Sequence, residues 1–177
     1  KNIRTKSNPW GLDPSERAKW IDEIKTEKSL DIKLAAQNKG NFEYLYWVGS
    51  PGAYDDRNKA VTKACAELFI KGGMDFAVLG NEEKSSGDTA RRAGDEGLFQ
   101  ELVLENIEIL NRYGVKKIIT HCPHTYNTFK NEYPEFGLIG VEVYHHTEIL
   151  AQMISQDYIK PHKEINETIT YHDPCYL

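Results

Sequence analysis

The feature that most constrains the fold of this sequence is an alternation, from Phe42 onward, of short apolar segments with longer amphipathic ones. The short segments have the length and composition of buried strands, and apolar residues recur between them at helical spacing. This alternation is typical of a domain whose mainly parallel sheet carries helices on both faces. We therefore predict a three-layer, Rossmann-like α/β domain over residues 41–167.

The predicted strands each end in glycine or in a polar residue, and they cover residues 44–49, 76–80, 117–121, 141–145 and 169–173. The predicted helices lie between them. One carries apolar residues from 61 to 69 and ends at Gly72, a second spans 99–110 and ends at Gly114, a third runs from Tyr126 to Pro134, and a fourth covers 149–154. In such sheets the loops that follow the strands gather at one edge, where ligands bind.

Residues 1–40 are mostly polar, with a turn at residues 8–11 and a short helix predicted from Pro14 to Ile24. We expect this segment to be an arm or linker outside the core. The chain begins at Lys1 and stops at Leu177, directly after a conspicuous motif, so we expect it to be part of a longer protein.

Composition excludes several classes of function. The net charge of −5 offers no basic surface for nucleic acid, and no apolar run approaches the roughly 20 residues of a membrane-spanning helix. No signal peptide is evident at the N-terminus. Three cysteines are an odd number without the spacing of a disulfide framework, which favours a reducing, cytoplasmic compartment.

Hydroxyl and thiol side chains follow the predicted strands at a regular spacing. Thirty-four residues separate Ser50 from Ser85, thirty-five separate Ser86 from Cys122, and two separate Cys122 from Thr125. Each of these positions lies just after a predicted strand or in the loop that follows it, so we expect them to meet at one edge of the sheet.

This spacing resembles that of the cysteine-rich, or CCG, domain of heterodisulfide-reductase-like iron–sulfur oxidoreductases, in which Cys, Cys-Cys-Gly and Cys-x-x-Cys stand at similar intervals. The surrounding sequence from Tyr44 to Leu177 is also similar to the branch of the family found in membrane-associated oxidoreductases. The similar segments are YWVG (46–49), GDTARR (87–92), NEYP (131–134), VYHHT (143–147) and HDPCYL (172–177), with NPWG (8–11) similar to the connector from a preceding ferredoxin-like segment.

The resemblance implies that these positions once held a 4Fe–4S cluster. Ser50 stands at the first cysteine, Ser85 and Ser86 at the pair, and Thr125 at the last, while Cys122 is retained. A cluster of this kind needs about four thiolates, and hydroxyls are poor ligands for iron. We therefore expect no cluster and no catalysis in this chain. An engineered replacement would use serine throughout and remove Cys122, so natural loss is the better account.

Family members carry two copies of the domain, which implies that a second repeat starts near residue 168 with Cys175 as its first cluster ligand. The first repeat would then form half of the shell around that cluster. By resemblance, the parent protein would be an oxidoreductase that carries electrons from an electron-transferring flavoprotein or the ferredoxin-like segment to a quinone or thiol acceptor. It would work at the cytoplasmic face of the membrane.

Other interpretations stay open at this point. Cys65 lies on the apolar face of a predicted helix and is expected to be core packing, whereas Cys122 is either a residual structural thiol or a ligand. A zinc or small-ligand site could reuse the empty pocket, although structural zinc spacing is absent. The candidate zinc ligands are His121, Cys122, His124, His145, His146, His172 and Cys175.

The loop after the second strand admits two further interpretations. Residues 80–87 could bind an anion, although they lack the glycine pattern of a nucleotide site. We instead expect the charged residues of this loop to form one ion-pair network that holds it in place. Those residues are Glu82, Glu83, Asp88, Arg91 and Arg92.

Overall fold

A computed structural model describes residues 1–38 and 40–174 and contains a five-stranded, fully parallel sheet. The strand order is β1-β3-β2-β4-β5. The strands are β1 (Lys33–Leu34), β2 (Tyr44–Trp47), β3 (Phe76–Val78), β4 (Lys117–Thr120) and β5 (Glu142–His145). Four of them coincide with predicted strands, and the α/β fold class is confirmed.

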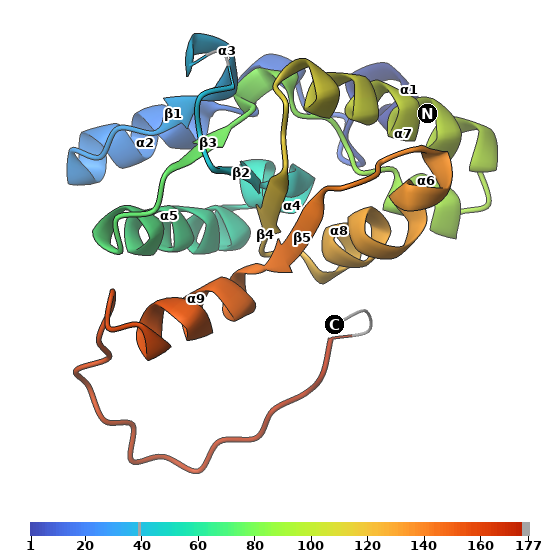
Figure 1. Cartoon of the computed structure of the whole chain (residues 1–177). Coiled ribbons are helices and arrows are strands. Elements are labelled where there is room, and N and C mark those ends of the chain that lie inside the picture. Colours follow the sequence, from blue (N-terminus) through green and yellow to red (C-terminus); the bar gives the residue numbers. More distant parts are fainter. Residues whose placement is uncertain (39, 175–177) are drawn as a thin grey trace.

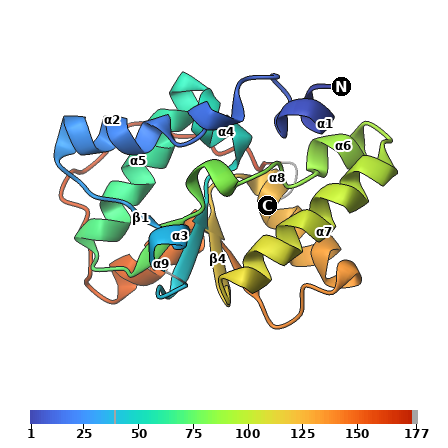
Figure 2. The same cartoon turned by 90° about the horizontal axis from the view of Figure 1, so that it is seen from above.

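Helices cover both faces of the sheet, as Figures 1 and 2 show. On one face lie α2 (Lys19–Lys28), α5 (Asp56–Lys71) and α9 (His146–Ser155), and on the other lie α7 (Glu96–Arg112) and α8 (Pro123–Asn127). The shorter elements are α1 (Asn2–Lys6), α3 (Ala35–Asn38), α4 (Gly49–Tyr54), α6 (Asp88–Arg92), three 3-10 turns (Pro14–Glu16, Gly80–Glu82 and Tyr133–Phe136) and a π turn (Thr128–Glu132). The predicted three layers are present.

Strand β2 shows why the core has two halves. Leu45 and Trp47 pack into the cluster beneath α7, whereas Tyr46 and Val48 pack into the cluster beneath α5 and α9. Successive side chains of a strand point to opposite faces, so a strand in the middle of a three-layer domain must be apolar on both. This is why β2 appears in the sequence as a continuous apolar run and not as an alternating one.

The two long helices begin and end where the sequence predicts. The Asp55 carboxylate accepts a hydrogen bond from Asn58 N at 2.9 Å and caps α5, and the Asp95 carboxylate accepts from Leu98 N at 3.1 Å and caps α7. Side-chain acceptors at this position satisfy N–H groups that a helix start leaves unpaired. Beyond the last turn of α7, Gly114 takes a positive φ of 62°.

The N-terminal segment is helical, as expected, but the expectation that it lies outside the core is wrong. Trp20 is 1% exposed and Ile24 is fully buried, because α2 packs along α5. Strand β1 pairs in parallel with β3, with Lys33 opposite Ala77. Only a few apolar residues point inward from this segment, and these are enough to place it in the domain.

The prediction of a strand over residues 169–173 is wrong. Residues 160–174 contain no helix or strand, and Ile169 and Tyr171 are 69% and 73% exposed. Figure 1 shows this tail running away from the helices and the sheet. A strand needs a partner for its backbone N–H and C=O groups, and the described part of the chain offers none here. Cys175 lies outside the described residues.

Two local differences from the predictions concern the loops that follow β2 and β4. The helix expected from Tyr126 begins earlier, at Pro123, and continues as the π turn. Helix α4 follows β2 directly and has no counterpart among the predicted helices. It approaches β4 closely, because a Cβ atom placed on Gly52 would lie 2.6 Å from Thr62 Oγ1 and 2.7 Å from His121 Cε1.

We expect Gly52→Ala to destabilise the domain by about 1–3 kcal/mol, because the added methyl group must displace buried neighbours. Gly97→Ala is the matched control, since its Cβ would meet nothing closer than 4.0 Å and α7 is already helical there. The free energy of unfolding measured in urea checks both. Equal effects of the two substitutions would contradict the close approach of α4.

Candidate functional site

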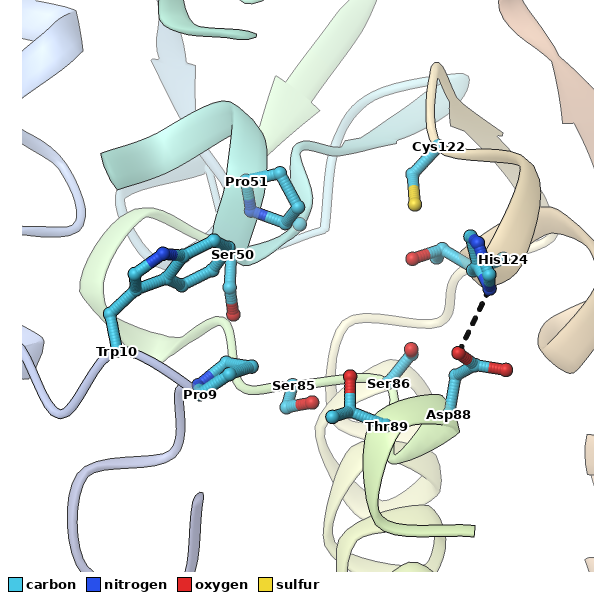
Figure 3. A pocket seen from close by; sticks show the side chains of 12 residues that line it. Pro9, Trp10, Ser50, Pro51, Ser85, Ser86, Asp88, Thr89, Cys122 and His124 are labelled. Carbon is cyan, nitrogen blue, oxygen red and sulfur yellow. Dashed lines mark hydrogen bonds and ion pairs between the residues drawn. The ribbon is translucent and has the colours of Figure 1, made fainter. Parts of the chain in front are cut away.

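A pocket of about 170 Å³ opens at the edge of the sheet formed by the carboxyl ends of the strands. Its lining includes all five positions singled out in the sequence, namely Ser50, Ser85, Ser86, Cys122 and Thr125. Figure 3 shows the hydroxyls of Ser50, Ser85 and Ser86 and the thiol of Cys122 pointing into one space. Positions separated by more than thirty residues in the sequence thus meet at one site.

The buried ion pair between Arg17 and Glu83 lies directly behind Ser50. Arg17 Nη1 is 2.8 Å from Glu83 Oε1, and Arg17 Nη2 donates to Ser50 Oγ at 2.8 Å. Glu83 also accepts from the backbone N–H groups of Val48 and Gly49, both at 2.8 Å. Burial raises the pKa of the Glu83 carboxyl, while Arg17 and these N–H groups act to lower it.

Arg17 was not identified from the sequence as part of the site. It lies in the polar N-terminal segment, and nothing in its local pattern distinguishes it from an exposed arginine. Pro9 and Trp10 of the same segment also line the pocket. The N-terminal segment therefore forms one wall of the site, in addition to its part in the core.

Backbone contacts hold the loop that carries Ser85 and Ser86. Asn106 Nδ2 donates to the Ser85 carbonyl and Tyr133 Oη donates to the Ser86 carbonyl, both at 2.9 Å. The next residue, Gly87, has φ +87°, and a Cβ there would lie 2.8 Å from Phe99 Cδ2. A glycine is required at this point of the loop for both reasons.

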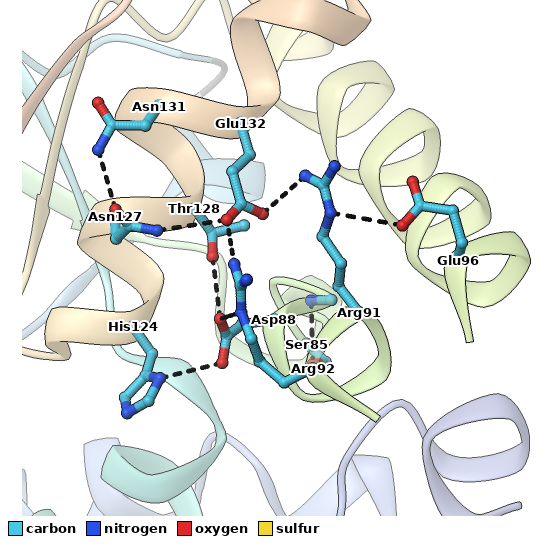
Figure 4. A network of polar contacts seen from close by, with 11 residues as sticks. Ser85, Asp88, Arg91, Arg92, Glu96, His124, Asn127, Thr128, Asn131 and Glu132 are labelled. Carbon is cyan, nitrogen blue, oxygen red and sulfur yellow. Dashed lines mark hydrogen bonds and ion pairs between the residues drawn. The ribbon is translucent and has the colours of Figure 1, made fainter. Parts of the chain in front are cut away.

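The predicted single ion-pair network is wrong, because the charged residues of this loop divide among separate partners. Glu83 pairs with Arg17, whereas Glu82 pairs with Arg112 and accepts from Tyr113 Oη. Asp88 pairs with Arg92 at 3.2 Å and with His124 Nδ1 at 3.1 Å, as Figure 4 shows. Arg91 and Arg92 both reach Glu132, a residue outside the predicted network.

Three of the histidines lie together behind the pocket, on the face of the sheet covered by α5 and α9. His121 Nδ1 is 2.7 Å from Tyr46 Oη, and His145 Nε2 is 3.2 Å from His146 Nδ1. Burial lowers the pKa of His121 to about 4 and that of His146 to about 4, assisted by the neighbouring histidines. These imidazoles are neutral at physiological pH.

The structure gives the zinc hypothesis no support. Among residues 1–38 and 40–174, no group of three or more His, Cys, Asp or Glu side chains is placed to hold a metal ion. His124 faces Asp88 instead, and His172 lies in the exposed tail. Cys122 is half-buried at the pocket.

Cys65 is core packing, as predicted. It is 4% exposed within the cluster beneath α5, and burial raises the pKa of its thiol to about 11. A thiol with such a high pKa stays protonated and is a poor nucleophile or ligand.

Residues 44–130 match the family model for the cysteine-rich domain CCG. The chain contains a cysteine-rich domain of the CCG family. The match begins at β2 and ends within the π turn, so it includes every strand and loop that contributes Ser50, Ser85, Ser86, Cys122 or Thr125 to the pocket. The resemblance inferred from the spacing of these positions is confirmed at the level of the family.

The relatives of this CCG chain are iron–sulfur proteins. It is 49% identical over 99% of its length to "Probable iron-sulfur-binding oxidoreductase FadF" of Bacillus subtilis, covering 25% of that protein. It is 45% identical to "EtfAB:quinone oxidoreductase" of Syntrophomonas wolfei, covering 24% of it. One polypeptide of the dihydromethanophenazine:CoB–CoM heterodisulfide reductase of Methanosarcina mazei is 33% identical over 96% of the chain, which covers 40% of that polypeptide.

The chain thus spans from about a quarter to two fifths of the length of these relatives. No solved structure matches it significantly. Among its described residues, no helix is both long and apolar enough to cross a membrane.

Glu83→Gln is expected to lower the free energy of unfolding by about 3–5 kcal/mol, because it leaves the Arg17 charge buried without a counter-ion. Glu101→Gln is the matched control. Glu101 pairs with Arg4 at 3.1 Å, but both side chains are more than half exposed, and such pairs contribute about 0–1 kcal/mol. Chemical unfolding at pH 7 measures both. Similar losses in the two variants would contradict the role assigned to the buried pair.

Stability should also fall as the pH drops from about 6.5 toward 4. In the unfolded chain His121 takes up a proton near pH 6.5, whereas in the folded domain it does so only near 4, so acid favours unfolding. The contribution of this side chain is up to about 3 kcal/mol. His121→Asn should flatten the pH dependence of urea unfolding, and His162→Asn in the exposed tail should leave it unchanged. An unaltered slope in His121→Asn would contradict this assignment.

Proposed function

We propose that this domain is the cluster-free first repeat of a two-repeat iron–sulfur electron-transfer protein. The observation that carries the proposal is the convergence of Ser50, Ser85, Ser86, Cys122 and Thr125 on one pocket at the strand ends of a CCG domain. In this family the corresponding positions are cysteines. The pocket keeps the arrangement of a cluster site and has lost all of its thiols except Cys122.

The chemistry of these side chains supports the absence of a cluster. Iron–sulfur clusters are held by thiolates, and a serine or threonine hydroxyl remains protonated at neutral pH and binds iron weakly. One remaining thiol cannot replace four. The domain would instead act as a scaffold and docking half for a cluster in a second repeat that begins near residue 168, with Cys175 as its first ligand.

The parent protein, in this proposal, transfers electrons between a flavoprotein or ferredoxin-like donor and a quinone or thiol acceptor. Support comes from the names of the relatives, which include an iron–sulfur-binding oxidoreductase, an EtfAB:quinone oxidoreductase and a component of a heterodisulfide reductase. A quinone acceptor would place the parent protein at the cytoplasmic face of the membrane. This domain would contribute structure and partner contacts, without catalysis of its own.

Anaerobic reconstitution of the chain with iron and sulfide tests the proposal. We expect far less than one 4Fe–4S cluster per chain by iron and acid-labile sulfide analysis, and no charge-transfer absorption. A variant with Ser50→Cys, Ser85→Cys, Ser86→Cys and Thr125→Cys should recover a cluster, because the pocket already brings these positions together.

A matched control carries four cysteines at exposed positions away from the pocket, Ser15→Cys, Thr26→Cys, Ser155→Cys and Thr168→Cys, and should bind no cluster. A full cluster in the unaltered chain would overturn the cluster-free role. Failure of the pocket variant to bind more iron than this control would overturn the assignment of the pocket as a former cluster site.

A further inference from the structure

Two hydroxyls in the pocket are buried and have no partner among the described residues. Ser86 is 8% exposed and Thr125 is 4% exposed, and neither side-chain oxygen makes a hydrogen bond to any described residue. Buried polar groups in native proteins are almost always hydrogen-bonded, and an unpaired one costs about 1–3 kcal/mol. Both residues line the pocket, so a molecule bound there would be in reach of their hydroxyls.

The other two hydroxyls of the pocket have protons to donate as well. Ser50 Oγ accepts from Arg17 Nη2 at 2.8 Å, and Ser85 Oγ accepts from Gly87 N at 3.2 Å. A hydroxyl can accept and donate at the same time, and no described residue accepts the proton of either serine. The pocket therefore presents four hydroxyl donors, from three different loops, to whatever it binds.

The charges around the pocket favour an anion over a cation. The Arg17 guanidinium stands directly behind Ser50 and already occupies part of the acceptor capacity that a cation would need. Asp88 is the single acidic residue among the described side chains that line the pocket, and Arg92 and His124 both contact its carboxylate. A bound anion would thus face hydroxyl donors and a carboxylate that is already paired.

We propose that the pocket binds a small oxyanion of the phosphate or sulfate class in the space that a cluster would fill. Such an anion has acceptor oxygens only and matches the four donors of Ser50, Ser85, Ser86 and Thr125. The pocket of about 170 Å³ exceeds the roughly 30 Å³ that one water molecule takes in the liquid. This inference rests on the proposed cluster-free role, because a cluster and an anion would compete for the same space.

Isothermal titration of the iron-free chain with inorganic phosphate and with sulfate tests the inference, with sodium chloride at equal ionic strength as the reference. We expect saturable binding of at least one of the two anions. The combined substitutions Ser86→Ala and Thr125→Val should weaken this binding at least ten-fold, whereas Thr125→Ser, which keeps the hydroxyl, should retain it. Circular dichroism and the melting temperature in chloride establish that each variant is folded.

Ser155→Ala combined with Thr26→Val is the matched control, since these exposed hydroxyls bond only to helix carbonyls, and it should bind as the unaltered chain does. Absence of saturable binding, equal loss in the control, or stabilisation by potassium but not by either anion would overturn the inference. Iron analysis of the same preparation separates this failure from failure of the cluster-free role. An iron-free chain without anion binding rejects the anion alone, and a chain that takes up a full cluster rejects both.

Discussion

The buried Arg17–Glu83 pair is the interaction on which the geometry of the pocket depends. It joins three parts of the chain that are distant in sequence, because Arg17 comes from the N-terminal segment, Glu83 follows β3, and the N–H groups that donate to Glu83 follow β2. A buried ion pair is stable only when its geometry and additional hydrogen bonds compensate the loss of hydration. Here each partner has such bonds, and the same bonds fix the position of Ser50.

The remaining walls of the pocket are held in the same way, by polar contacts within the protein. Asn106 and Tyr133 support the carbonyls of Ser85 and Ser86, and His124 and Arg92 hold Asp88 at the far side. No metal bond is needed to keep these loops in place. A site can therefore retain its shape after its ligands have changed from thiols to hydroxyls, which is the situation that the proposed function describes.

Most of the fold and the membership of the pocket could be predicted from the sequence. Strands such as β2 and β4 are buried on both faces and appear as short apolar runs, and the loops after parallel strands must share one edge of the sheet. The sequence could not reveal contacts that depend on single side chains. Arg17 resembles any surface arginine, and the inward side chains of Trp20 and Ile24 are too few to produce a strong periodic pattern. The strand predicted at 169–173 has suitable residues and lacks a partner among the described residues.

The way in which the pocket is held bears on how the longer relatives of this chain mature. A cluster site that folds around its metal must wait for iron and sulfide to be delivered before its loops settle. In this domain the Arg17–Glu83 pair and the carbonyl contacts of Asn106 and Tyr133 form without any cofactor. The domain can thus fold as soon as its own residues have been synthesised, and its folding is independent of the iron supply of the cell.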